Sequence, residues 1–277
     1  MSDGQPARLS NRGGGYVEDV QVSAVPSGGH ELVFRGPIGA LEQVKLCDVS
    51  YVTRGGGVGP GWRRLWSNAS APTTATSTLL DLLGTFLTVT TPASVDFGLV
   101  LDWYKDPVQG VLPGAWPNTA VGELVHRGKY WYKDEADAAK QRQCGLALVT
   151  QLCALINRHP LLSGFDSIAS VPGHDSRVLS FGARLAAAVG RQLNKPLIVC
   201  KDQTGFRPPI KDVEPSQRLS LIENTFTCRS DLSRQSVLII DDIYSTGTTA
   251  SETSRALRSV GATQVASLCP VRTMRSI

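Results

Sequence analysis

The strongest hydrophobic pattern in the chain is an unbroken run of four aliphatic residues at 237–240, three of them β-branched. A run without polar alternation is typical of a parallel strand that is covered on both faces of its sheet. Asp241 and Asp242 follow directly, then a turn of small residues, and a helical pattern extends from about 250 to 260. Because open α/β sheets bind ligands at the carboxyl ends of their strands, we expect a ligand site at this acid pair.

Upstream patterns predict the rest of an α/β domain. Residues 165–172 and 196–200 have the pattern of strands, and a polar loop and a helical stretch ending near 193 lie between them. Residues 134–159 predict a long helix with one apolar face, and a further apolar segment lies at 221–228. Alternating strands and helices favour a parallel sheet with helices on its faces.

The first 120 residues have a different pattern. Alternation predicts strands at 16–25, 31–36 and 43–53, and residues 77–88 predict a short apolar helix. Residues 93–104 suit either a strand or a helix. The glycine-rich stretch at 55–61 indicates a flexible hairpin connection, because no strand-to-helix context follows it.

These patterns divide the chain into three parts. Gly4, Gln5, Pro6 and the glycine run at 13–15 predict that residues 1–15 are a disordered tail. Residues 16–120 form a β-rich or mixed amino-terminal region of unknown role, and residues 121–277 form the α/β domain.

The charge distribution follows the same division. Residues 1–120 contain eight Lys and Arg against ten Asp and Glu, so of the chain's 28 and 24 the remainder holds 20 and 14. The carboxyl-terminal part therefore carries +6, which suits an anionic ligand. Its basic residues are scattered and lack the interleaved aromatics of a groove for single-stranded nucleic acid.

The six cysteines argue against structural zinc. No two of them lie two to four residues apart, as a zinc site requires. Several fall within apolar runs, where a free thiol packs as a small hydrophobe. Together with the lack of a signal-peptide pattern and of an apolar stretch of about twenty residues, this predicts a cytoplasmic protein with no membrane association.

The turn after the acid pair has the composition of an anion site. Gly247 tolerates unusual backbone angles, hydroxyl-bearing residues surround it, and a helix begins just beyond. Backbone N–H groups of such a turn and the helix amino end bind phosphate. A ligand that carries a phosphate together with neutral hydroxyls reconciles this anion site with two adjacent acids. Ribose 5-phosphate is such a ligand.

The segment from residue 237 to 250 resembles the phosphoribosyl pyrophosphate signature of type I phosphoribosyltransferases. The resemblance implies a Rossmann-like α/β core with a central parallel sheet. It also implies that the acid pair contacts the ribose hydroxyls and is catalytic, with Mg²⁺ as cofactor and Asp241 and Asp242 as metal ligands only through water. A flavodoxin-like or Rossmann-like strand with incidental acids is the alternative.

The same resemblance implies roles for three further groups of residues. The turn would bind the 5-phosphate through Ser245, Thr246, Gly247, Thr248 and Thr249. The loop after the first core strand would grip pyrophosphate through Gly173, His174 and Arg177. A mobile loop would close over the reacting centre and supply one or two cations from Lys201, Arg207, Lys211 and Arg218.

A narrower resemblance, over about 121–273, is to the ComF-like, competence-associated branch. Lys129 and Tyr130 match its lysine-tyrosine pair, and Arg218 and Phe226 match its arginine and phenylalanine. Its Arg-Gly-Phe-Asn segment is replaced here by residues 179–183, and its four-cysteine zinc module is absent. In type I enzymes a variable hood covers the acceptor, and residues 16–120 are a candidate for this hood.

Two functions from different classes follow from these resemblances. The first is transfer of a phosphoribosyl group from phosphoribosyl pyrophosphate to a nitrogenous, nucleobase-like acceptor, with release of pyrophosphate. The alternative is a non-catalytic ligand-sensing or accessory module linked to DNA uptake or nucleic-acid metabolism. A phosphoribosyl pyrophosphate synthetase is disfavoured, because no matching ATP site is evident. A homodimer and contact with nucleic-acid machinery stay open.

Overall fold

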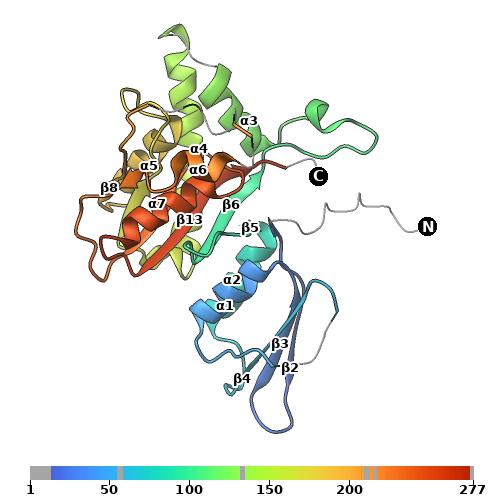
Figure 1. The fold of residues 1–277 in the computed structure, drawn as a ribbon. Coiled ribbons are helices and arrows are strands. Elements are labelled where there is room, and N and C mark those ends of the chain that lie inside the picture. Colours follow the sequence, from blue (N-terminus) through green and yellow to red (C-terminus); the bar gives the residue numbers. More distant parts are fainter. Residues whose placement is uncertain are drawn as a thin grey trace.

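The computed structural model describes residues 14–54, 59–131, 135–206, 208, 213–214 and 217–274. Figure 1 shows a larger α/β body and, below it, a smaller body made of a three-stranded sheet and two helices. The prediction of an α/β fold with a central parallel sheet, preceded by a region with β structure, is confirmed.

Eight strands of the described chain form the central sheet. Along the sheet the order is β1 (Gly14–Gly15), β5 (Leu87–Val89), β6 (Phe97–Trp103), β13 (Gln264–Arg272), β11 (Ser236–Ile240), β7 (Ser167–Ser170) and β8 (Leu197–Val199). The strands from β6 to β8 are parallel, whereas β5 and β1 run antiparallel at one edge. The short β12 (Ile243–Tyr244) pairs with the end of β13.

Strand β11 lies inside the sheet, between β13 and β7. Leu238 and Ile240 belong to the core that also contains residues of α4 (Ala138–Arg158) and α5 (Phe181–Gln192). Val237 and Ile239 belong instead to the core with α7 (Thr248–Arg258). Successive side chains point to opposite faces of a strand, so burial on both faces explains the unbroken apolar run.

Shorter elements connect these layers. The helices are α3 (Ala120–His126) and α6 (Arg218–Ile222), and β9 (Lys201–Asp202) pairs with β10 (Phe226–Thr227) in a separate two-stranded sheet. Single turns occur at η1 (Pro113–Ala115), η2 (Arg127–Trp131), η3 (Glu135–Asp137) and η4 (Leu162–Gly164). The apolar segment at 221–228 is therefore part of α6 followed by a strand.

The smaller body contains β2 (Glu18–Ala24), β3 (His30–Arg35) and β4 (Trp62–Ser67), with α1 (Ile38–Cys47) and α2 (Thr74–Thr85). The strand predicted at 43–53 is wrong, because most of its first half belongs to α1. Ala40, Leu41 and Val44 are buried there at helical spacing, which alternation over so short a run did not separate from a strand.

Other predicted limits shift by a few residues. The helix predicted at 77–88 begins at Thr74, because the Thr73 hydroxyl accepts the Thr76 N–H and caps it. Residues 93–104, left open, contain β6. Gly14 and Gly15, assigned to the tail, pair with β5, and β5 and β6 join the same sheet as strands beyond residue 121.

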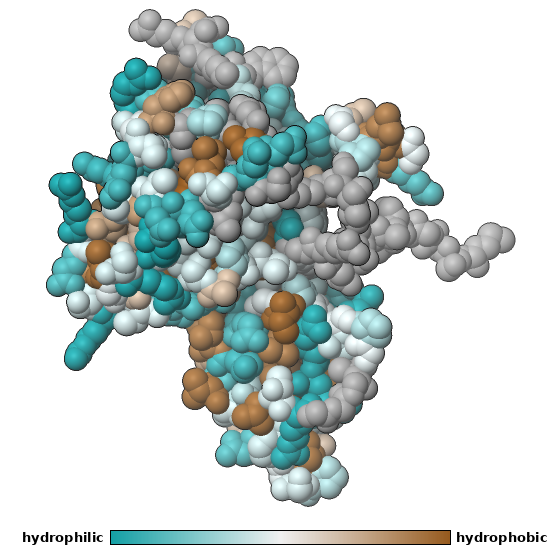
Figure 2. Space-filling model, viewed as in Figure 1, coloured by the Kyte–Doolittle hydropathy of each residue, from teal (hydrophilic) through white to brown (hydrophobic). Residues whose placement is uncertain are grey.

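The outer surface of the smaller body is partly apolar. On the face seen in Figure 2, apolar side chains gather over its helices, and the exposed ones in and after α1 include Ile38, Leu46 and Val49. In the described part of the chain, no helix combines the length and the hydrophobicity needed to cross a lipid bilayer.

Candidate functional site

The acid pair lies at the carboxyl end of β11, flanked by the ends of β13 and β7. Asp242 is buried, with 6% of its surface exposed, and Asp241 is half-buried. The Asp242 backbone N–H donates to Asp241 Oδ1 at 2.9 Å. One oxygen of Asp241 is thus fixed by the backbone of its neighbour, which orients the carboxylate at the edge of the sheet.

Lys129 brings a cation to this pair from η2. Its Nζ donates to Asp242 Oδ1 at 2.9 Å, and the Lys129 side chain is 30% exposed. Burial opposes the charge of this amine, but Asp242, Tyr130 and Asp241 outweigh it and raise the pKa of Lys129. The lysine therefore stays protonated, and it neutralises one of the two carboxylates.

The start of α5 packs directly against the acid pair. A Cβ placed on Gly182 would lie 2.4 Å from Asp241 Oδ1 and 3.2 Å from the Asp242 nitrogen. The helix begins at Phe181, since the Ser180 hydroxyl accepts the Ala183 N–H and caps it. Only a residue without a side chain fits at position 182 while Asp241 keeps this place.

The turn of residues 245–249 leads into α7. Gly247 is the N-cap residue, with φ +78° in the left-handed region, and it makes no side-chain cap. The hydroxyls of Thr246 and Thr248 lie 2.8 Å apart, and Thr246 is exposed. A helix amino end without a capping side chain presents its N–H groups to an anion, so the geometry suits a phosphate.

Tyr244 of β12 packs against Gly247 of the turn. It is buried, its hydroxyl donates to the Thr90 carbonyl at 2.8 Å, and burial raises the pKa of its phenol. A Cβ on Gly247 would lie 2.4 Å from this hydroxyl oxygen. Strand β12 and the segment after β5 therefore fix the backbone of the turn together.

The loop predicted to grip pyrophosphate is held by its own ion pair. Asp175 accepts from Arg177 Nε at 2.9 Å and from Nη2 at 2.8 Å, and from the Arg177 backbone N–H at 2.9 Å. These hydrogen bonds hold the pKa of Asp175 at about 2. Arg177 and His174 are both exposed, whereas Gly173 is half-buried after the end of β7. The guanidinium fork thus faces a carboxylate of the same loop.

The predicted mobile loop is only partly within the described residues. Lys201 lies in β9 and is exposed, and Arg218 begins α6. Arg207 and Lys211 lie outside the described residues, as does the side chain of Arg218. The first part of this loop contacts the loop at 173–177, because the Ser176 N–H donates to the Gly205 carbonyl at 3.0 Å and Asp175 forms an isolated bridge with Phe206.

The sequence prediction missed further polar side chains on the same edge of the sheet. Asp102 lies near the end of β6, beside Val271 of β13, and burial raises its pKa. The Tyr104 hydroxyl lies 3.2 Å from His126 Nδ1, and burial, followed by the nearby Tyr130, raises the pKa of Tyr104 to about 12. The sequence held a signal for Asp102, because this acid directly follows the mostly apolar run at 97–101, as Asp241 follows the run at 237–240.

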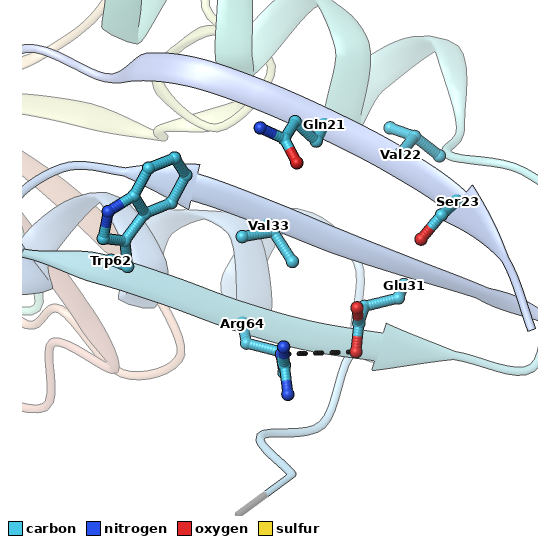
Figure 3. Close-up of a pocket in the computed structure, with 7 residues that line it drawn as sticks. All are labelled: Gln21, Val22, Ser23, Glu31, Val33, Trp62 and Arg64. Carbon is cyan, nitrogen blue, oxygen red and sulfur yellow. Dashed lines mark ion pairs between the residues drawn. The ribbon is translucent and has the colours of Figure 1, made fainter. Parts of the chain in front are cut away.

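A separate hollow of about 490 Å³ lies on the three-stranded sheet of the smaller body (Figure 3). Trp62, Val33 and the ion pair of Arg64 with Glu31 line it. None of the predicted site residues belongs to this lining. The acid pair and this hollow are therefore different places on the molecule.

The acid pair has the chemistry of a Mg²⁺ site that is completed by a ligand. Mg²⁺ takes carboxylate oxygens, usually one or two, together with phosphate oxygens and water. Within the described residues, no group of three or more His, Cys, Asp or Glu side chains is placed to hold a metal ion alone. Asp241 and Asp242 fit Mg²⁺ that is shared with a bound phosphate or with water.

One protein-family model matches part of the chain. Residues 178–276, less than half of the sequence, match the family model described as "Phosphoribosyl transferase domain". The matched part contains the acid pair, the turn and α7. A search of curated proteins found no match.

Several solved structures are similar to this chain at low identity. Adenine phosphoribosyltransferase from Leishmania tarentolae aligns at 11% identity and a TM-score of 0.38, over 67% of this chain and 94% of that one. Orotate phosphoribosyltransferase from Aeropyrum pernix aligns at 18% and 0.32, over 49% and 63%. Phosphoribosylpyrophosphate synthetase from Mycobacterium smegmatis aligns at 18% and 0.32, over 47% of this chain and only 34% of its own length.

Proposed function

We propose that this protein is a phosphoribosyltransferase, of the family whose model matches residues 178–276, and that it transfers a phosphoribosyl group from phosphoribosyl pyrophosphate to a nitrogenous acceptor. The observation that carries the proposal is the adjacency of two features. An acid pair ends a buried parallel strand, and an uncapped helix amino end follows five residues later. The acids suit sugar hydroxyls, and the helix end suits a phosphate.

The proposed mechanism assigns the ribose hydroxyls, the 5-phosphate and the acceptor's proton to named residues. Asp241 and Asp242 accept hydrogen bonds from the ribose hydroxyls, and residues 245–249 bind the 5-phosphate through backbone N–H groups and hydroxyls. The acceptor nitrogen attacks C1 as pyrophosphate leaves from the opposite face, and we assign the removal of the acceptor's proton to Asp242. Asp241 and Asp242 would hold Mg²⁺ through water, and the ion would supply charge stabilisation for the departing pyrophosphate.

The remaining assignments complete the proposal. Gly173, His174 and Arg177 form the pyrophosphate loop, and the segment from Lys201 to Arg218 closes over the centre to exclude water. To bind pyrophosphate, the Arg177 guanidinium must release its hydrogen bonds to Asp175 and donate them to the ligand. We also propose the ComF-like branch as the nearest group, on the basis of Lys129, Tyr130 and Phe226.

The test is pyrophosphate release from phosphoribosyl pyrophosphate and Mg²⁺ in the presence of each nucleobase in turn. We expect release that depends on one acceptor, and Asp241→Asn and Asp242→Asn should each reduce it at least about 100-fold, as losing a transition-state contact does. Asp81→Asn, an exposed acid of α2, is the matched control and should leave the rate unchanged. If the two Asn variants keep the wild-type affinity for ribose 5-phosphate in calorimetry, the assignment of the site is wrong.

One observation favours the alternative function of a ligand-sensing module. Arg177, the candidate for pyrophosphate, is already paired through two nitrogens with Asp175. A protein that binds phosphoribosyl pyrophosphate, but releases no pyrophosphate with any nucleobase, would fit a sensing or accessory role in nucleic-acid metabolism. The same assay therefore decides between the two functions.

A further inference from the structure

The acid pair presents an electrostatic difficulty for an anionic ligand. Asp241 and Asp242 are adjacent in the chain, and Asp242 is almost fully buried. A ligand with a phosphate that binds a few residues away meets two like charges at short range, in an environment where charges are poorly screened. A protein cation beside the pair would lower this repulsion whether or not Mg²⁺ is bound.

Lys129 is such a cation by its position. Its Nζ lies 2.9 Å from Asp242 Oδ1, and only 9% of the Asp242 side chain and 30% of the Lys129 side chain are exposed. The two residues are 113 positions apart, so the fold and not local sequence brings them together. A charge-assisted hydrogen bond at this degree of burial is stronger than one at the surface.

The backbone around Lys129 is fixed by contacts from two helices. The Gln141 side chain of α4 donates to the Gly128 carbonyl at 3.0 Å, and Arg184 of α5 donates to Gln141 Oε1 at 3.1 Å. A Cβ on Gly128 would lie 2.8 Å from the Phe181 ring, so η2 packs closely on the start of α5. The same helix start packs on Asp241, which places lysine and acid pair in one rigid arrangement.

We propose that Lys129 is a charge-balancing residue of the sugar-phosphate site, which neutralises Asp242 so that the acid pair carries one net negative charge where the ligand's hydroxyls bind. This role rests on the proposed function, since it concerns the same site. Lys129 acts through Asp242 and does not touch the ligand. It is a positioning residue, which distinguishes it from the cations assigned to pyrophosphate.

The experiment measures the affinity for ribose 5-phosphate by calorimetry. The double-mutant cycle consists of four proteins: wild type, Lys129→Met, Asp242→Asn and the double variant. Two further variants, Lys129→Arg and Lys45→Met, are controls. We expect Lys129→Met to weaken binding about tenfold, as the loss of a hydrogen bond to a charged group does. Lys129→Arg keeps the charge and should bind within about threefold of wild type. Lys45→Met removes a lysine from an exposed pair on α1 and should change nothing.

The double variant separates a role through Asp242 from direct contact with the ligand. If Lys129 acts through Asp242, adding Lys129→Met to Asp242→Asn costs less than about threefold, because the carboxylate that needed a cation is gone. The thermal unfolding midpoints of the same four proteins, measured without ligand, supply a second double-mutant cycle. In this cycle too, we expect Lys129→Met to lower the midpoint less in the Asp242→Asn background than in wild type. Additive effects in either measurement would overturn the proposal.

Failure of the proposed function gives a different result. Wild-type protein that does not bind ribose 5-phosphate overturns the function and the ligand role of Lys129 together. Wild-type binding with unchanged affinity in Lys129→Met overturns only the role of Lys129.

Discussion

At the scale of single residues, the contact between Gly182 and Asp241 constrains the acid pair closely. A methyl group at position 182 would overlap Asp241 Oδ1, the oxygen that also accepts the Asp242 N–H. The carboxylate can give way only by rotating out of its place at the end of β11. Position 182 therefore controls, by direct contact, the orientation of an acid that lies far along the chain at position 241.

We predict that Gly182→Ala reduces the affinity for ribose 5-phosphate at least about tenfold and costs about 1–3 kcal/mol of unfolding free energy, as overpacking does. Calorimetry and urea unfolding measure the two effects. Gly145→Ala in α4 is the matched control, because a Cβ there meets nothing within 4 Å. That control should be neutral or slightly stabilising, since alanine favours a helix more than glycine does.

The sequence alone predicted the acid pair and the turn, because their residues are contiguous and their chemistry is local. The sequence singled out Lys129 only by its resemblance to a lysine-tyrosine pair of a family. It could not predict that Asp242 is the partner of this lysine, because the two residues are 113 positions apart. It treated the segment around Gly182 as a departure from a family pattern. The physical reason for a glycine there, its contact with Asp241, belongs to the packing of α5 on β11 and has no local signal.

At the scale of elements, α7 performs two tasks. Its amino end follows the turn of residues 245–249, and its middle fixes β10 through a buried acid. Glu252 is 4% exposed and accepts from Arg255 Nη2 at 2.6 Å and from the Phe226 N–H at 3.3 Å. Arg255 also donates to the Phe226 carbonyl at 2.8 Å. Strand β10 closes the segment that begins at β9, so α7 holds the base of the predicted mobile loop.

We predict that Arg255→Leu speeds amide hydrogen exchange at Phe226 and lowers the unfolding free energy by about 2 kcal/mol, because it leaves the buried Glu252 without its cation. Hydrogen exchange followed by mass spectrometry or NMR checks the first effect. Arg191→Leu, at an exposed arginine of α5, is the control. Unchanged exchange at β10 in Arg255→Leu would show that the strand is held by other contacts.

Element type was predictable where patterns were long. The strand at 237–240 was predicted from an unbroken apolar run, which burial on both faces explains. The helix near 138–158 was predicted from an apolar stripe, which burial on one face explains. The second half of α1, residues 43–47, was mistaken for part of a strand because so short a run of mixed polarity fits both periods. The interaction of α7 with β10 depends on a folded neighbour and could not be predicted from either segment.

At the scale of the whole molecule, a buried polar contact joins the two bodies. His159 after α4 is fully buried, and its Nε2 lies 3.1 Å from Gln43 Oε1 of α1. Its Nδ1 accepts the N–H groups of Leu161 and Leu162 at 3.3 Å. Nδ1 is therefore unprotonated and Nε2 carries the hydrogen, so the neutral ring satisfies every partner. Burial lowers the pKa of His159 to about 4.

We predict that the unfolding free energy falls as pH drops from about 6.5 toward 4. The unfolded chain binds a proton at His159 near pH 6.5, whereas the folded chain does so only near pH 4. The contribution of this residue is complete above pH 6.5 and decreases by about 1.4 kcal/mol per pH unit within that window.

Urea unfolding at several pH values measures this dependence in wild type and in His159→Gln. The variant should lack the part of the slope that comes from His159, so the two curves converge as pH falls. His174→Gln, at an exposed loop histidine, serves as the control and should retain the wild-type slope. Parallel curves for wild type and His159→Gln would contradict the assignment.

The position of β13 has a consequence for how the protein is made. This strand, buried along nearly its whole length, separates β6 from β11 in the sheet, although β6 comes from residues 97–103 and β13 from 264–272. On a ribosome, β6 emerges long before β13 and β11 emerges shortly before it, so the facing edges of both strands stay unpaired until β13 is synthesised and inserts between them. Contacts of such wide separation slow folding and leave strand edges open to misassociation, so we expect nascent chains of this protein to fold with a higher yield when chaperones are present.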